Sequence, residues 1–294
     1  MIKTIFLVAL FLLTSFAAIT QNDDLFALLE EEPSGPDFTI ATFKSTRIIN
    51  GQSIQMTPAN EMIFTVSHHF GRVNSGLKQF FGLDQSTVRL GLEYGITDWF
   101  TVELGRSSFN KMVDGSVKFR LIRQQTGERN IPVTVVAYSS ANIRTAPWIV
   151  FAEDYLFNHR LAYTHQVLIA RKFSSDFSLQ LTPTLVHFNM VALEEEYNTI
   201  PALGIGGRYK FLPQLALNAE YFFVPDQYRK TNTDRSLSVG FDLETGGHVF
   251  QLFLTNSMAM YDPGFIAETN GKWTNGDIFF GFNITRVFTL TRPK

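Results

Sequence analysis

Charged side chains fall on one face of several strand-like runs, and they are the residues of this chain best suited to chemistry. Arg89 and Glu93 alternate with apolar residues within 86–94, and Glu103 does the same within 99–107. Residues two apart on a β-strand share a face, so each run has a charged face and an apolar face. The inward polar set predicted on this basis comprises Arg89, Glu93, Glu103, Lys118, Arg120, Arg208, Lys210, Glu220 and Asp242.

Two functions fit this mixed set of charges. Rings of charged side chains select solutes in membrane pores, so the set would line the path of a small solute or ion. Alternatively, the same residues would form a network of salt bridges and hydrogen bonds that fills a closed lumen. Because both signs occur, the set argues against a strongly anion-selective or cation-selective channel.

Residues for catalysis or metal binding are not predicted. His68 and His69 are adjacent on a strand, so their imidazoles leave opposite faces and cannot share one metal ion. A lipid hydrolase would need Ser and His in hydrogen-bond reach on one face, with an orienting polar partner. Ser67 and His69 have a suitable spacing but face the predicted lumen. With no nucleophile elbow or phosphate loop, we predict no enzyme, no cofactor and no metal site.

Length and composition restrict the class of protein. The chain has 294 residues, enough for one large β domain or two small ones. Its formal net charge of −2 gives no electrostatic basis for binding nucleic acid. Zero cysteines excludes disulfides, thiolate metal sites and a lipid-modified N-terminal cysteine.

The first 20 residues predict a cleaved signal peptide. Lys3 supplies the positive end, residues 5–16 form a short apolar run, and small residues precede a cut before Gln21. The alternative is a membrane anchor helix, but a spanning helix needs about 20 apolar residues and this run is shorter. The chain is therefore expected to be exported.

Residues 21–60 are predicted to precede the folded domain. The first part, 21–37, is acidic and would be either a disordered tail or a short helix. The stretch 41–54 carries Lys44 and Arg47, and these cations would reach inward carboxylates if the stretch entered the lumen. The three expected acceptors are Glu93, Glu103 and Glu220. Such a segment would be a plug, and the barrel would be closed at rest.

From residue 61 to about 290 the chain alternates apolar and polar residues in strand-length runs. Tight turns such as 96–98 and 212–214 alternate with longer polar connections such as 71–85 and 256–276. Outer-membrane barrels have short periplasmic turns, long outer loops and an even strand number. About twelve strands are expected: 61–70, 86–94, 99–107, 115–124, 132–143, 160–173, 177–190, 199–211, 215–224, 236–243, 248–255 and 277–288.

The composition of the two faces indicates which one meets lipid. A soluble barrel or β-sandwich alternates too, with apolar residues inside. Here the polar face is rich in glycine, which would leave room in a narrow lumen for charged side chains from the opposite wall. The apolar face is bulky, and aromatics such as Trp99, Phe173 and Phe211 flank the tight turns. Aromatic girdles of this kind are typical of membrane barrels, so the apolar face should lie in lipid.

Three stretches carry a resemblance to a known family: 41–54, FTVSHHFGR at 64–72, and residues 81–124. They resemble an uncharacterised family, a membrane-bound β-barrel domain of unknown function found in exported proteins of the Bacteroidota. Where that family has a Ser-His-Arg-Phe-Gly pattern, this chain has His69 at the arginine position. The resemblance implies a membrane β-barrel and brings no established activity or catalytic residues.

These observations predict an all-β protein, a closed antiparallel transmembrane β-barrel of about twelve strands in the outer membrane of a Gram-negative bacterium. Its expected function is porin-like passage of a small solute or ion. The alternative is a non-conducting barrel that serves as a structural subunit of an envelope complex. A third hypothesis is an outer-membrane enzyme that acts on lipid. Expected partners are outer-membrane lipid and either a small solute or other envelope proteins.

Overall fold

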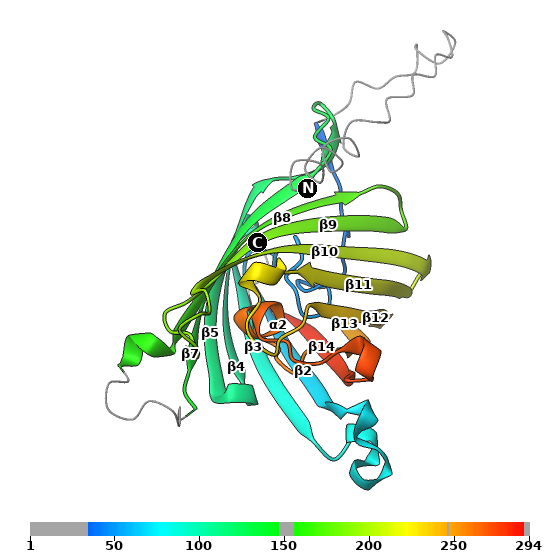
Figure 1. Cartoon of the computed structure of the whole chain (residues 1–294). Helices are drawn as coiled ribbons and strands as arrows, with labels where there is room; N and C mark the ends of the chain where they lie inside the picture. The colour runs from blue at the N-terminus through cyan, green and yellow to red at the C-terminus, as the bar shows by residue number, and fades with distance from the viewer. Residues whose placement is uncertain (1–34, 147–155, 246, 291–294) are drawn as a thin grey trace, which may run out of the picture.

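Twelve antiparallel strands form a closed barrel in the computed structural model, which describes residues 35–146, 156–245 and 247–290 (Figure 1). Each strand pairs with the next along the chain, and the last pairs with the first, so no barrel edge is left unpaired. The predicted strand number is confirmed. The strands are β2 (Glu61–Arg72), β3 (Ser86–Thr97), β4 (Phe100–Ser107), β5 (Met112–Ile122), β7 (Thr134–Arg144), β8 (Leu161–Lys172), β9 (Phe177–Phe188), β10 (Thr199–Leu212), β11 (Leu215–Phe223), β12 (Ser236–Thr245), β13 (His248–Thr255) and β14 (Phe279–Thr289).

Short and long connections alternate as expected and define two ends of the barrel, with two exceptions: 123–133 at the turn end is long, and 108–111 at the loop end is short. The turn end has connections such as 98–99 and 213–214, whereas the loop end has 73–85 and 256–278. The predicted signal peptide, the acidic residues 21–34 and loop residues 147–155 lie outside the described residues. Short helices sit on the loop end: η1 (Val73–Ser75), η2 (Leu77–Gly82), η3 (Phe109–Lys111), η4 (Phe157–Arg160), η5 (Asp226–Tyr228), α2 (Asp262–Ala267) and η6 (Trp273–Asn275).

One feature of the turn end was not predicted. The turn residues at 126–130 predict a tight turn between β5 and β7, but this connection contains a strand of its own, β6 (Gln125–Gly127). This strand pairs with β1 (Pro36–Phe38) to form a separate two-stranded sheet. The small sheet anchors the chain at the barrel mouth just before it enters the lumen.

The alternation along each strand places polar residues inside and apolar residues outside. On β4, Leu104 is 70% exposed while its neighbour Glu103 is 6% exposed. Aromatic rings gather where the strands end: Phe100 stacks on Phe119 at the turn end, and Phe70 on Phe280 at the loop end. This distribution matches a wall that faces hydrocarbon between two interfaces. Within the described ranges, no helix is long and apolar enough to cross a membrane.

Two segments fill the inside of the barrel. Residues 42–57, hereafter the lumen hairpin, run into it from the turn end and are almost wholly buried (blue in Figure 1). Helix α2 folds in from the loop end, and its six residues are all buried. The hairpin packs its apolar side chains on β7 and β8, and α2 packs on β9, β10 and β11. The hairpin cluster is Phe43, Ile48, Ile54, Met56, Val136, Tyr138, Leu168 and Ala170, and the α2 cluster includes Phe265, Ile266, Val186, Ile200 and Phe222.

Candidate functional site

The lumen hairpin is built around a tight turn. The Ile48 N–H donates to the Gly51 carbonyl at 2.8 Å, and the Ser53 N–H donates to the Thr46 carbonyl at 2.9 Å. Asn50 and Gly51 are residue types favoured in turns. A turn this short leaves its own amide N–H groups pointing away from the hairpin, so they need acceptors elsewhere.

Glu220 on β11 supplies those acceptors. The amides of Asn50, Gly51 and Ile49 donate to its carboxylate at 2.8, 3.0 and 3.2 Å. The side-chain amide of Asn50 also reaches Ser238 on β12 at 3.2 Å. Three backbone donors around one carboxylate are an anion-binding arrangement, and here the anion belongs to the barrel wall. Glu220 therefore holds the tip of the hairpin.

Arg47 forms the buried ion pair of the hairpin. Its Nη2 donates to both oxygens of Glu103, at 3.0 and 3.2 Å, and its Nη1 donates to the Asn50 carbonyl at 2.9 Å. Glu103 also accepts from Arg89 on β3 at 2.9 Å, and Arg89 forms a second ion pair with Asp114 on β5. All four side chains are buried. The predicted inward residues Arg89 and Glu103 thus meet each other and the hairpin in one network.

Wall residues also hydrogen-bond the main chain of the hairpin. Lys118 donates to the Thr46 carbonyl at 2.9 Å, with longer contacts to the Ser53 and Gln55 carbonyls. Gln180 accepts from the Ile54 N–H at 3.0 Å and donates to the Gln52 carbonyl at 2.7 Å. Gln251 and Asn283 donate to the carbonyls of Ile48 and Ile49 at 2.8 and 3.0 Å. Both polar groups of the peptide backbone are therefore satisfied by wall side chains.

Glu93 depends on the hairpin as well. It lies directly opposite Glu103 in the pairing of β3 and β4, and adjacent like charges on paired strands repel. Thr57 of the hairpin donates its hydroxyl to Glu93 in a short hydrogen bond. Two neighbouring wall carboxylates therefore each have a hairpin donor.

The remaining predicted residues lie closer to the turn end. Lys44 was expected to reach Glu93, Glu103 or Glu220, and that expectation is wrong: its Nζ lies 2.6 Å from Glu244 at the rim. The cause is position, since Lys44 precedes the turn and sits near the mouth. Lys210 pairs with Asp176 at 3.1 Å in the β8–β9 turn. Arg120 lies at the same end and is partly exposed, whereas Arg208 is buried. Asp242 is buried too and accepts from Gln251 at 2.8 Å.

Glycines on the inner face make room for their near neighbours and for the hairpin, not for side chains from the opposite wall as expected. A Cβ at Gly91 would lie 2.9 Å from Arg89 Nη1 and 3.0 Å from Glu103 Oε1. At Gly206 the space is taken by the Ile48 side chain of the hairpin. Some of the glycine signal in the sequence therefore reflects the hairpin.

The loop end of the lumen is closed by α2. Gln52 of the hairpin donates to the Tyr138 hydroxyl at 3.3 Å, and Tyr138 in turn donates to Asp262 of α2. Ser140 donates to the same carboxylate at 3.1 Å. Burial raises the pKa of Asp262, against the opposing charge of Arg47. The gap between the hairpin tip and β9–β11 is too small to hold a water molecule.

Sequence reasoning missed the uncharged part of this site. Gln180, Asn283 and Tyr138 all bind the hairpin, yet polar uncharged residues are common on any strand and carry no distinctive signal. The alternation along each strand placed these residues on the inner face, but it gave no sign of the segment that they bind. Among the described residues, no cluster of three or more His, Asp or Glu side chains could hold a metal ion.

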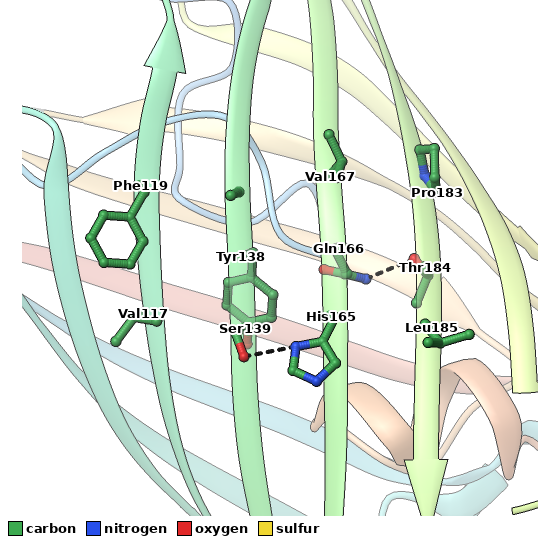
Figure 2. Close-up of a pocket in the computed structure, with 11 residues that line it drawn as sticks. Val117, Phe119, Tyr138, Ser139, His165, Gln166, Val167, Pro183, Thr184 and Leu185 are labelled. Atoms are coloured by element: carbon green, nitrogen blue, oxygen red, sulfur yellow. Dashed lines mark hydrogen bonds between the residues drawn. The ribbon is translucent and has the colours of Figure 1, made fainter. Parts of the chain in front are cut away.

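A groove of about 550 Å³ lies on the outer wall, across β5, β7, β8 and β9. Figure 2 shows Ser139 and His165 side by side in it, joined by a hydrogen bond of 3.0 Å between Oγ and Nδ1. The two residues are direct partners in the register of β7 and β8. A search for Ser and His on one strand could not find this pair, because it forms between strands. Its apolar surroundings include Val117, Phe119, Val167 and Leu185.

Three solved structures are similar to this chain over most of its length. The NanC porin has a TM-score of 0.47 and 9% identity, and the match covers 78% of this chain and 98% of that one. The KdgM porin has a TM-score of 0.45 and 9% identity, covering 79% and 99%. An outer membrane channel from Pseudomonas putida F1 has a TM-score of 0.45 and 14% identity, covering 80% and 98%. No curated protein matches the chain.

The family comparison agrees with the architecture described above. A family model described as a membrane bound beta barrel domain matches residues 43–288, which takes in nearly all of the lumen hairpin and of the barrel. The closed ring of strands, the exposed apolar outer wall and the buried polar lumen are what such a domain requires. The chain therefore belongs to the membrane bound beta barrel domain family, DUF5777.

Proposed function

We propose that this protein passes a small solute or ion across the outer membrane, and that the lumen hairpin, together with α2 at the loop end, closes the path at rest. The observation that carries the proposal is the way the lumen is filled. The wall carboxylates Glu93, Glu103 and Glu220 all bind a segment that precedes the barrel in the chain. A segment of this kind is able to leave while the barrel wall stays intact.

The barrel belongs to the outer-membrane type, with its apolar outer wall in lipid. In that setting the turn end, which carries the short connections, is periplasmic. The hairpin would then leave towards the periplasm, through the mouth by which it enters.

The contacts of the hairpin support reversible closure. Most are hydrogen bonds, and each exchanges with water at a net cost of about 0.5–1.5 kcal/mol, or about 1.5–3 kcal/mol where a charge takes part. The wall exposed by its departure is mostly polar and would be hydrated, except where Val136, Leu168 and Ala170 pack on the hairpin. A permanently closed barrel would not need a separate segment, because side chains of the wall could fill the lumen by themselves.

A disulfide lock tests the proposal, because the chain has no cysteine of its own. Both γ carbons of Ile48 lie 3.7 Å from the position of a Cβ at Gly206, so Ile48→Cys with Gly206→Cys would place the two cysteine side chains next to each other. Full-length protein would be reconstituted in planar bilayers, and the current recorded before and after reduction. We expect the oxidised protein to be silent and the reduced protein to open in steps.

Single variants Ile48→Cys and Gly206→Cys are the matched controls, and reduction should leave their currents unchanged. Equal currents from the oxidised and reduced double variant would show that hairpin movement is not needed for conduction. Silence from the wild type, both single variants and the reduced double variant would overturn the proposed passage. Slower gel migration after heating would confirm in each case that the barrel is folded.

A second candidate function is a non-conducting scaffold in an envelope complex. The observation in its favour is an apolar surface on the loop between β2 and β3, where Leu77 is 78% exposed and Phe80 and Phe81 are also exposed. Both phenylalanines have positive φ, at 43° and 53°, a backbone conformation disfavoured for bulky residues. Cross-linking in whole cells, compared with a Leu77→Ser/Phe80→Ser variant, would identify a partner held there.

Catalysis is not part of the proposal. The Ser139–His165 pair lies on the outer wall, and within the described residues no second polar side chain hydrogen-bonds the imidazole to orient it. The backbone of both residues is committed to the pairing of β7 with β8 and of their other neighbours. This leaves no evident group to stabilise an oxyanion.

A further inference from the structure

The lumen wall is complementary to a peptide, not only to a charge. Lys118, Gln251 and Asn283 donate to main-chain carbonyls of the hairpin. Glu220 accepts from three consecutive main-chain amides, and Gln180 binds one amide and one carbonyl. These contacts do not depend on hairpin side chains, so another peptide of similar backbone shape would satisfy them.

One side-chain contact gives this surface a preference. Arg47 Nη2 donates to both oxygens of Glu103, while Nη1 of the same guanidinium donates to the Asn50 carbonyl at 2.9 Å. A planar guanidinium divides its donors between two separate acceptors in this way, which suits arginine better than lysine. When the hairpin is absent, Glu103 keeps Arg89 as a partner, while neighbouring Glu93 loses the Thr57 hydroxyl. The vacated lumen would therefore hold two adjacent carboxylates with fewer donors than before, which favours entry of a cation.

We propose that the solute carried by this barrel is a short peptide bearing arginine, and that the lumen hairpin occupies its binding site as an internal competitor. The peptide backbone would bind Lys118, Glu220, Gln251 and the other wall groups in place of residues 46–55. Its guanidinium would bind Glu103. This inference rests on the proposed function, because it names the solute of the same path.

The test uses full-length protein whose hairpin is weakened while the wall is left intact. Arg47→Gln with Thr57→Val removes the hairpin donors to Glu103 and Glu93. In planar bilayers, the open channel would be titrated with acetyl-Gly-Arg-Gly-amide. Matched peptides would carry neutral citrulline or anionic glutamate in place of arginine. Liposome swelling with the same three peptides would report passage as well as binding.

We expect the arginine peptide to interrupt the current at a concentration about tenfold lower than the citrulline peptide, since the two differ by one charge-assisted contact. Swelling should be fastest with the arginine peptide and slowest with the glutamate peptide. Adding Glu103→Gln to the variant should bring the arginine and citrulline peptides to within about twofold of each other, because their one differing contact is lost.

Three outcomes would count against the inference. Equal effects of the arginine and citrulline peptides would remove the assigned chemistry while leaving a conducting barrel and the proposed function intact. A preference that survives Glu103→Gln would move the recognition to another residue and overturn the assignment to this site. No current from any variant, with folding confirmed by heat-dependent migration, would overturn the proposed function and this inference together.

Discussion

Replacing Glu220 by Gln is expected to release the lumen hairpin while preserving the barrel. The carboxylate accepts three backbone N–H groups of the hairpin turn, at 2.8, 3.0 and 3.2 Å. A Gln side chain keeps one acceptor oxygen and turns an NH₂ group towards amides that are themselves donors. At least one charge-assisted hydrogen bond is lost, and the others become neutral.

The expected magnitude follows from the usual contribution of such bonds. Hydrogen bonds to a charged group contribute about 1.5–3 kcal/mol each, and neutral ones about 0.5–1.5 kcal/mol. The three amides are adjacent, so their losses are not additive, and a total of about 2–4 kcal/mol is expected. Because 1.4 kcal/mol is a factor of ten, the ratio of open to closed protein should rise by about 30-fold to 700-fold.

Single-channel recording measures that ratio directly as open probability at a fixed voltage. Asp242→Asn is the matched control, because it removes another buried carboxylate from the lumen but keeps the oxygen that accepts from Gln251. Its open probability should stay within a few-fold of wild type. If Glu220→Gln leaves open probability unchanged, or if Asp242→Asn raises it equally, then the amide contacts of the turn do not hold the hairpin.

Three further predictions concern separate parts of the molecule. Arg47→Met should destabilise the folded protein by at most about 3–5 kcal/mol in urea unfolding followed by gel migration, because Glu103 stays buried with Arg89 as its remaining cation. The double variant with Glu103→Gln should recover part of the loss. Burial raises the pKa of Asp262 above its ordinary 3.8. Docking of α2 is therefore most stable below pH 3.8 and weakens as the pH rises through the higher pKa that Asp262 has in the docked state. Hydrogen exchange of the α2 amides should become faster over that pH range, and Asp262→Asn should abolish the pH dependence. On the lipid face, Ser139→Ala alone should destabilise by about 1 kcal/mol because His165 loses its hydrogen bond, whereas adding His165→Leu should restore or exceed wild-type stability.

The sequence by itself determined the architecture of the barrel. Strands were predicted at 86–94 and 215–224 and are observed at Ser86–Thr97 and Leu215–Phe223. The reason is that period-two alternation and turn residues are local properties, written within each run of about ten residues. The same alternation predicted that Arg89, Glu103 and Glu220 point inward, and all three are buried.

Only the tertiary structure decided which of these residues meet. Lys44 was expected at a lumen carboxylate and instead pairs with Glu244 at the rim. Glu220 binds backbone amides, which carry no side-chain signal in a sequence. The Ser139–His165 pair exists because β7 and β8 are in one register, and a shift of one residue would place the two side chains on opposite faces. The face on which a side chain lies is set locally, by alternation along its own strand. Contacts between strands and with the lumen hairpin depend on the register of the strands and on closure of the whole barrel.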